Sequence, residues 1–367
     1  MFNYPIYFYP HAYLRDRQLD TIRNWPLEQV LNPQLSEERR GAQVTSTQSL
    51  AKTLHVTWKQ CLPLVNLKLR PKRLPSDAVV YVWGGVLVWG PFIVELDNPY
   101  ALTGYNIKAM SLYRGLLNRF LKSSRCLDIR CLSQACKETV RLLFGEAVAA
   151  KASIHYPRIL HVVDQVSIKT GVECRFLFVG TQFEIKGGAA LVRAFRRVYE
   201  QVPSAHLDMI THLPPEFSRE VADCSGITVH EARFSRQEIW DRFMCQADVL
   251  VHPTYVESFG MVVLEALAHG LAIIATDVYA IHEMVQDGVN GALLKPPLSI
   301  WDGFQPSKYY LKLEVIKSCI ADTDTGQFEH DLTVAMLRLA HDVAIRGRFR
   351  AASRKLFLDK FSGSDTR

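Results

Sequence analysis

The feature that most constrains the fold is a repeated alternation of short apolar runs with amphipathic segments. It is clearest in the second half of the chain, where helices are expected at residues 187–202, 235–246, 260–270, 282–288 and 334–361. Strands alternating with helices predict an α/β fold whose parallel sheet is covered by helices on both faces. The strands of this half are expected at residues 175–180, 206–211, 226–231, 248–253, 271–276 and 292–297.

The first half shows the same alternation less regularly. The window 78–96 is long enough to cross a bilayer, but Gly84, Gly85, Gly90 and Pro91 interrupt it. We therefore expect two buried strands joined by a loop. The expected strands are 6–9, 79–83, 91–96 and 126–133, and the expected helices are 49–62, 105–125 and 135–145.

The chain has 367 residues, enough for two domains of ordinary size. We predict an N-terminal domain at 1–165, a C-terminal domain at 166–340 and a closing helix at 341–367, with the linker near 158–172. The polar stretch 298–330 is expected to lack regular secondary structure. The N-terminal sequence lacks the layout of a signal peptide, and the eight cysteines include no C-x-x-C pair, so a cytoplasmic setting is expected.

Charge is unevenly distributed between the two halves. Residues 1–165 hold 21 Lys and Arg against 12 Asp and Glu, a net of +9, whereas the remainder has 22 and 25, a net of −3. A basic half beside a mildly acidic half predicts that the first half meets an anionic partner.

Two glutamates eight positions apart mark the most informative stretch, 254-TYVESFGMVVLEALAHGLAIIAT-276. Glu257 precedes the expected helix, and Glu265 lies inside it among apolar residues. A buried carboxylate is costly unless a cation or hydrogen-bond donors pair with it. A buried arginine or the hydroxyls of a vicinal diol would each satisfy Glu265, and both explanations stay open. Glu257 is suited to accept hydrogen bonds from a polyol or to act as a helix cap.

A second loop, 180-GTQFEIKGG-188, also joins a strand to a helix. Ligands of parallel sheets bind beyond the carboxyl ends of the strands, and a helix N-terminus favours phosphate. Lys186 adds a full positive charge, and Gly187 allows a close backbone approach. The spacing is not that of a Walker A loop, and an ordinary turn before a helix explains this segment equally well.

Together these segments resemble the retaining glycosyltransferases of family 4. The run from Glu257 to Glu265 is similar to the family's E-x7-E motif, and FLFVGTQFEIKGGAALVRAF is similar to its loop at the donor diphosphate. The segment DVYAIHEMVQDGVNGALLKPP matches the stretch that follows, and the likeness extends over about residues 125–297. It implies the GT-B fold, in which two Rossmann-like βα domains face each other across a cleft. It also implies transfer of a hexose from a nucleotide sugar.

The resemblance assigns roles to particular residues. Lys186 would face the donor diphosphate, Glu257 would hold the sugar near its 3- and 4-hydroxyls, and Glu265 would bind the ribose. Family members retain the anomeric configuration and stabilise the leaving phosphate with cationic side chains, so neither a metal nor a separate cofactor is expected. The other expected donor-binding positions are Gly180, Thr181, Gly187, Ser258, Phe259, Gly260 and Met261.

The chain departs from the family pattern at several places. The family's glycine-rich first loop is not evident in residues 1–20, and Ala272 replaces a usual proline. Two further departures concern expected catalytic positions. The family's phosphate-binding arginine follows the loop glycine, whereas this chain has Thr181. Asp97 (or Glu95) stands near the position of the family's active-site histidine. Asp97 is predicted as a catalytic residue that orients the acceptor or stabilises the anomeric carbon, and a cap of the turn at Asn98–Pro99 is an equal alternative.

The expected acceptor is a glycan or lipid-linked saccharide of the cell envelope. We predict that the basic residues of 67–76 and 105–125 attach the enzyme peripherally to the anionic inner face of a membrane. A core-packed helix with a solvated basic face is the alternative, and no nucleic-acid motif is present. The cations concerned are Lys68, Arg70, Lys72, Arg73, Lys108, Arg114, Arg119, Lys122 and Arg125.

Three rival interpretations remain. Asp322 and Asp324 imitate the D-x-D metal motif of other glycosyltransferases, but they lie in a polar loop and a chance match is favoured. A catalytically inactive relative that binds a nucleotide sugar, or a scaffold protein, would share the same motifs. A GT-B sugar-nucleotide epimerase is the third, although the sequence shows no additional set of acidic residues and histidines for it.

Overall fold

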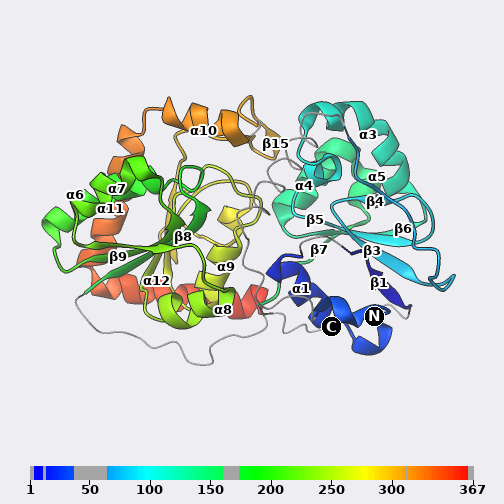
Figure 1. Cartoon of the computed structure of the whole chain (residues 1–367), viewed down its shortest axis with the longest axis horizontal. Helices are drawn as coiled ribbons and strands as arrows, with labels where there is room; N and C mark the ends of the chain where they lie inside the picture. Colours follow the sequence, from blue (N-terminus) through cyan, green and yellow to red (C-terminus); the bar gives the residue numbers. More distant parts are fainter. Residues whose placement is uncertain (1–3, 11–13, 37–63, 160–172, 311–312, 363–367) are drawn as a thin grey trace. The chain divides into compact units, whose positions relative to one another are not determined.

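The computed structural model describes residues 4–10, 14–36, 64–159, 173–310 and 313–362. The chain divides into two compact units, Met1–Arg158 and Ile159–Arg367. Each unit is built around a parallel sheet flanked by helices (Figure 1). The boundary predicted at residues 165–166 and the helix predicted at 49–62 lie outside the described residues.

The first unit contains a five-stranded parallel sheet in the order β1-β3-β5-β6-β7. All residues of β3 and β5 are buried, as expected of strands covered on both faces. Helix α1 lies on one side of this sheet and α3 and α4 lie on the other (Figure 1). The strands are β1 (Ile6–Phe8), β3 (Val79–Trp83), β5 (Phe92–Leu96), β6 (Cys126–Cys131) and β7 (Ala152–Ile154). The helices are α1 (Asp16–Arg23), α3 (Ile107–Lys122), α4 (Gln134–Phe144) and α5 (Glu146–Ala149).

Three short strands were not predicted in this unit: β7, which completes the sheet, and two very short strands outside it. Strand β2 (Leu67–Lys68) pairs in parallel with β4 (Val86–Leu87), so the glycine-interrupted window holds a short extra strand between its two predicted ones. The central prediction of two buried strands in this window is confirmed. Among the described residues, no helix is both long and apolar enough to span a bilayer.

The second unit contains a six-stranded parallel sheet in the order β10-β9-β8-β11-β12-β13. Its hydrophobic core joins the sheet to α6 and α11, and α12 packs against α9 and β12. The strands are β8 (Arg175–Gln182), β9 (His206–His212), β10 (Ile227–Glu231), β11 (Val249–His252), β12 (Ala272–Thr276) and β13 (Gly291–Leu294). The helices are α6 (Gly188–Gln201), α7 (Ser218–Ala222), α8 (Arg236–Ile239), α9 (Met261–Ala268), α10 (Leu313–Ala321), α11 (Gly326–His341) and α12 (Val343–Leu356).

Several predicted helices have different limits in the structure. The helix predicted at 282–288 is only a 3₁₀ turn at Ile281–Glu283. The stretch expected to be irregular, 298–330, contains the antiparallel hairpin β14 (Trp301–Asp302) and β15 (Gln305–Pro306), helix α10 and the start of α11. Helix α8 continues as a π-helical turn, Trp240–Met244, and begins with the predicted capping box of Ser235 and Glu238.

Candidate functional site

The two loops predicted to bind the donor emerge from neighbouring strands. Strands β8 and β11 pair in parallel, so the loops that follow them leave the same edge of the sheet. The backbone N–H of Tyr255 donates to the carbonyl of Ile185 at 3.0 Å and ties the loops together. Gly187 has a φ of +76°, and a Cβ there would lie 2.1 Å from the carbonyl oxygen of Pro253. Any other residue at 187 would therefore push the loops apart.

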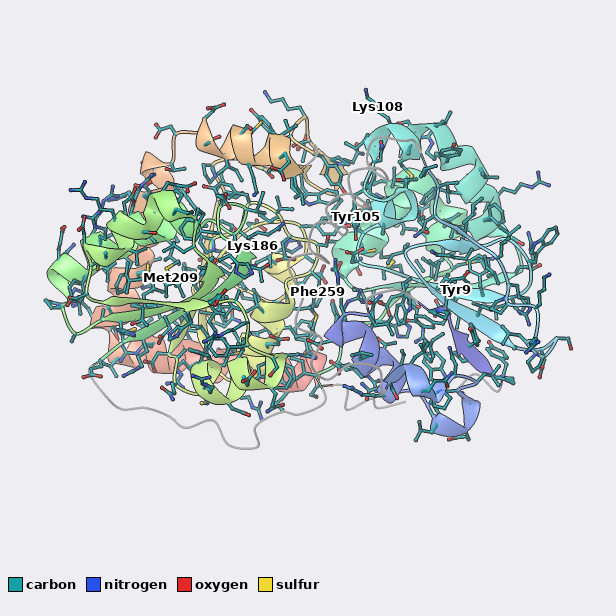
Figure 2. The ribbon with its side chains drawn as sticks, viewed as in Figure 1. Tyr9, Tyr105, Lys108, Lys186, Met209 and Phe259 are labelled. Atoms are coloured by element: carbon teal, nitrogen blue, oxygen red, sulfur yellow. The ribbon has the colours of Figure 1, made fainter. Side chains whose placement is uncertain are left out.

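Lys186 and Glu257 form an ion pair between these loops. Lys186 Nζ lies 2.9 Å from Glu257 Oε2 and donates to the carbonyl of Val256 at 3.0 Å. Glu257 Oε1 accepts from the backbone N–H of Ser258 at 3.2 Å. The two side chains are 20% and 18% exposed, so the pair is sheltered yet reachable. Figure 2 labels Lys186 and Phe259, one on each loop.

The surroundings of Glu257 fix its charge. Burial alone would raise the pKa of Glu257, but the charge of Lys186 and a hydrogen bond with His252 outweigh it and hold the pKa below its ordinary value. Glu257 therefore stays ionised at neutral pH. A carboxylate with so low a pKa is a poor general base and a good hydrogen-bond acceptor.

His252 belongs to this cluster, although the sequence analysis did not single it out. It is the last residue of β11, its side chain is 1% exposed, and its Nε2 lies 3.2 Å from Glu257 Oε2. The available signal was a lone polar side chain at the carboxyl end of an apolar strand, five residues before Glu257.

Glu265 lies in α9 and is paired with an arginine. Arg236 Nε donates to Glu265 Oε1 at 2.7 Å, and both side chains are largely buried. The guanidinium of Arg236 also lies over the ring of Trp240, 4.5 Å from its centroid. One of the two open explanations for Glu265, an arginine partner, is therefore present. Arg236 could have been noticed as a cation in the first turn of a helix, where the helix dipole disfavours it.

The start of α9 matches what an anion-binding loop requires. Gly260 has a φ of +94° and precedes the helix, which begins without a side-chain cap. Phe259 is 3% exposed and anchors the loop in the core, and Met261 opens the helix. The N–H groups of an uncapped helix start can bind phosphate or hydroxyl oxygens.

The remaining predicted positions lie at the end of β8. Gly180 and Thr181 directly precede its last residue, Gln182, and Thr181 is exposed. A Cβ at Gly180 would lie 2.9 Å from the Lys186 side chain, so the glycine makes room for that lysine. In the described part of the chain, the contacts of Lys186 and Glu257 include no arginine that would replace the one missing at Thr181.

Asp97 belongs to the first unit and follows β5. Its Oδ1 accepts from the backbone N–H of Asn98, and its Oδ2 accepts from the hydroxyl of Tyr105, both at 2.8 Å. The side chain that caps the 3₁₀ turn Pro99–Thr103 is instead that of Asn98, which accepts from the backbone N–H of Tyr100 at 3.0 Å. Tyr105 has a φ of +63°, a strained conformation for an aromatic residue. The neighbouring Glu95 is buried and paired with Arg17.

The described residues contain no group of three or more His, Cys, Asp and Glu side chains arranged to hold a metal ion. Asp322 and Asp324 follow α10, and Asp324 Oδ1 accepts from the backbone N–H of Gly326 at 2.9 Å. This contact gives Asp324 a local role at the turn before α11.

Comparison with protein families gives a match to "Glycosyl transferases group 1" over residues 173–302, which includes both loops that were predicted to bind the donor. Among curated relatives, the D-inositol 3-phosphate glycosyltransferase of Paenarthrobacter aurescens (strain TC1) is 35% identical over 29% of this chain and 20% of its own length. The α-maltose-1-phosphate synthase of Mycobacterium tuberculosis (strain CDC 1551 / Oshkosh) is 30% identical over 41% and 40%. The lipopolysaccharide glucosyltransferase WaaG of Escherichia coli (strain K12) is 28% identical over 34% and 33%. The chain thus spans between a fifth and two fifths of these relatives.

Solved structures extend the likeness to the whole chain at the level of fold. Anabaena HepE, crystallised with UDP and glucose, superposes with a TM-score of 0.59 at 13% identity over 97% of this chain and 95% of its own. WaaG, described as a glycosyltransferase of lipopolysaccharide biosynthesis, gives 0.55 at 15% identity over 97% and 95%. The protein therefore has the GT-B fold of these glycosyltransferases, and residues 173–302 of its second unit are similar to the glycosyl transferases group 1 family.

Proposed function

We propose that the protein is a retaining, metal-independent glycosyltransferase that moves a hexose from a nucleotide sugar to a glycan or lipid-linked acceptor. The observation that carries this proposal is the Lys186–Glu257 pair, set between two donor loops at the start of α9 and inside the group 1 domain. A lysine charge beside an uncapped helix start suits a diphosphate. An ionised carboxylate beside it suits sugar hydroxyls.

In this proposal, different residues interact with different parts of the donor and with the acceptor. Lys186 stabilises the negative charge that grows on the diphosphate as the glycosidic bond breaks. Glu257 accepts hydrogen bonds from hydroxyls of the sugar and orients it. Glu265 accepts from the ribose and shares its charge with Arg236. Asp97, held by Tyr105, acts on the acceptor side.

The direct test is a screen of nucleotide sugars, beginning with UDP sugars because HepE was crystallised with UDP. A ligand that binds only the folded chain raises its unfolding temperature. The best binder is then assayed for slow hydrolysis, which releases free sugar and nucleoside diphosphate. Binding without hydrolysis or transfer would favour an inactive nucleotide-sugar-binding protein or scaffold. An epimeric nucleotide sugar as the product would favour an epimerase.

Metal independence is tested in the same assay. Because Lys186 supplies the cation in this proposal, adding EDTA should leave the hydrolysis rate within about twofold of its starting value. A large loss reversed by manganese would contradict the proposal and return attention to Asp322 and Asp324.

We also propose that the first unit attaches the enzyme to an anionic membrane surface. Helix α3 exposes Leu112 and Leu116, at 65% and 40%, among its cations. Leu117 and Leu121 of the same helix are buried in the core. A hollow of about 640 Å³ at the end of α3 is lined by Gly115, Asn118, Arg119, Lys122, Ser123 and Arg125.

Trp89 extends this surface beyond the helix. It is 63% exposed, and the carbonyl of the preceding Val88 accepts from Arg125 Nη1 at 2.7 Å. An exposed tryptophan beside arginine and lysine is typical of side chains that sit at a membrane interface. Each cation near an anionic surface contributes on the order of 1 kcal/mol.

Sedimentation with anionic and neutral vesicles tests this attachment. The protein should pellet with anionic vesicles at low salt, and the double substitution Arg119→Glu and Lys122→Glu should reduce the pelleted fraction. Arg219→Glu, an exposed position in the second unit, is the matched control. If the native chain does not bind anionic vesicles at low salt, the proposal is wrong. The basic face would then be only a solvated surface, and the acceptor would be soluble.

A further inference from the structure

His252 and Lys186 both contact the same carboxylate oxygen. Glu257 Oε2 lies 2.9 Å from Lys186 Nζ and 3.2 Å from His252 Nε2. The lysine is 20% exposed, whereas the histidine is 1% exposed. One partner of Glu257 can therefore reach a ligand, and the other is fixed in the core at the end of β11.

The buried histidine acts as a neutral donor. Burial lowers the pKa of His252, and the nearby charge of Lys186 adds to this effect against the opposing pull of Glu257. A neutral imidazole carries one N–H, and an ionised carboxylate can only accept, so the proton lies on Nε2. The other nitrogen, Nδ1, is buried and has no hydrogen-bond partner among the described residues. Placing the proton there would leave a buried N–H unpaired.

We propose that His252 is a positioning residue that keeps Glu257 in place while Lys186 serves the donor diphosphate. This inference rests on the glycosyltransferase function proposed above. A diphosphate beside Lys186 competes with Glu257 for the lysine charge. With Lys186 drawn to the diphosphate and His252 absent, the one donor left to Glu257 among the described residues is the backbone N–H of Ser258, on the opposite oxygen. His252 restores a donor to Oε2 without adding a positive charge.

If His252 positions Glu257, its loss should lower the reaction rate without changing the affinity for the nucleotide. Because His252 contacts Glu257 and not the expected diphosphate position, its loss should leave binding of a nucleoside diphosphate nearly unchanged. A displaced Glu257 would instead misplace the sugar, and an error of about 1 Å in positioning can cost on the order of 100-fold in rate. Discrimination between sugars that differ at one hydroxyl should weaken as well.

The experiment compares His252→Phe with His252→Gln. Phenylalanine fills the space of the imidazole without a donor, and glutamine carries an amide N–H at a position similar to Nε2. Donor hydrolysis gives kcat and KM, calorimetry gives the affinity for UDP, and the unfolding temperature checks the fold. We expect His252→Phe to lower kcat by about 10- to 100-fold with UDP affinity changed by less than about threefold, and His252→Gln to recover most of the rate.

Several outcomes would overturn the inference. Native-like kcat in His252→Phe, equal loss in both variants, or a parallel loss of rate and UDP affinity would each show that His252 does not act through its N–H. In the native protein, ¹⁵N NMR should show the proton of His252 on Nε2, with and without UDP, and a proton on Nδ1 would contradict the assignment. A native chain that hydrolyses no donor would remove the proposed function itself, whereas an active native chain with an active His252→Phe would remove this inference alone.

Discussion

The two units each contain a carboxylate–cation pair at a parallel sheet, and the two pairs differ in what surrounds them. In the first unit, Glu95 on β5 pairs with Arg17 of α1 and accepts from the hydroxyl of Tyr81 at 2.6 Å. Its side chain is 4% exposed. In the second unit, Glu257 lies in a loop beyond β11, pairs with Lys186 and is 18% exposed.

The difference teaches how to separate a structural pair from a candidate site. Glu95 lies within a strand, and its partners come from the same sheet and the helix that covers it. Glu257 lies past the end of its strand, next to an uncapped helix start, where the ligands of parallel sheets bind. The family match covers the second pair and not the first.

A second polar cluster lies on the same sheet as the buried pair, and its Arg130 guanidinium lies 5.6 Å from the ring centroid of Tyr81. Arg130 lies 3.2 Å from Asp128, and the hydroxyl of Ser153 donates to the other oxygen of that carboxylate at 2.5 Å. The guanidinium of Arg130 also lies over the ring of Trp25, 4.6 Å from its centroid. Such networks are costly to break at a single partner, so we expect the charges here to govern stability.

The largest predicted effect concerns Arg17. Replacing it with Met leaves Glu95 buried without its cation, which should lower the free energy of unfolding by about 3–5 kcal/mol. Nucleotide affinity should not change, because the candidate donor residues lie in the other unit. Chemical denaturation and calorimetry with UDP measure the two quantities. The double variant Arg17→Met and Glu95→Gln should recover much of the stability. A loss of UDP affinity in folded protein would break the comparison.

The next effect concerns Glu265, for which an arginine partner and the hydroxyls of a ribose are two competing explanations. Glu265→Gln should weaken nucleotide binding by about 1.5–3 kcal/mol, the range for a hydrogen bond to a charged group. Arg236→Gln is the matched control, since it removes the other half of the same pair. We expect it to lower stability while leaving UDP affinity within a few-fold. Equal effects of both substitutions on UDP affinity, or none from Glu265→Gln, would make the pair purely structural.

A smaller effect is expected from pH. The folded protein holds the pKa of His252 and His269 below their ordinary value of 6.5, in both cases chiefly through burial, so each contributes stability that is present above pH 6.5. That stability is lost as the pH falls through their folded pKa values. Glu257, whose pKa lies below its ordinary 4.5, adds a further loss at lower pH. His282 has a raised pKa through its hydrogen bond with Asp277 and acts in the opposite direction, but it is 41% exposed.

Thermal unfolding followed from pH 7 downward checks this sign. The unfolding temperature should fall steadily below pH 6.5, and His252→Phe should make that decline shallower because it removes one of the two histidines with a lowered pKa. An unfolding temperature that rises on acidification, or an unchanged slope in the variant, would contradict the proposed state of His252.

The strand alternation was predictable because it is local. Runs such as VVYVW and LAIIAT are so apolar that their burial can be predicted from their composition alone. The helix cap at Ser235 can be predicted from Glu238 three residues later. The Lys186 and Glu257 loops were found because each follows a strand. Their direct contact was not predicted, because it depends on the strand order of the sheet.

The sequence predictions missed features that depend on residues far apart in the chain. Arg17 and Glu95 are 78 positions apart, and Arg236 and Glu265 are 29 apart, so no local pattern announces either pair. The helix expected at 282–288 is only one 3₁₀ turn in the structure. It closely follows Tyr279 in the sequence, whose φ of +54° lies outside the helical region.

The central claim is that Lys186 acts on the leaving diphosphate, and Lys186→Ala tests it most directly. The variant should lose on the order of 100- to 1,000-fold in the rate of donor hydrolysis, the range seen when one preorganised charge-stabilising donor is removed. Its affinity for the nucleoside without phosphates should stay unchanged, and Lys355→Ala, an exposed lysine of α12, should behave as the native protein. A rate within about twofold of native in Lys186→Ala, or a loss that comes entirely from weaker nucleoside binding, would contradict the account.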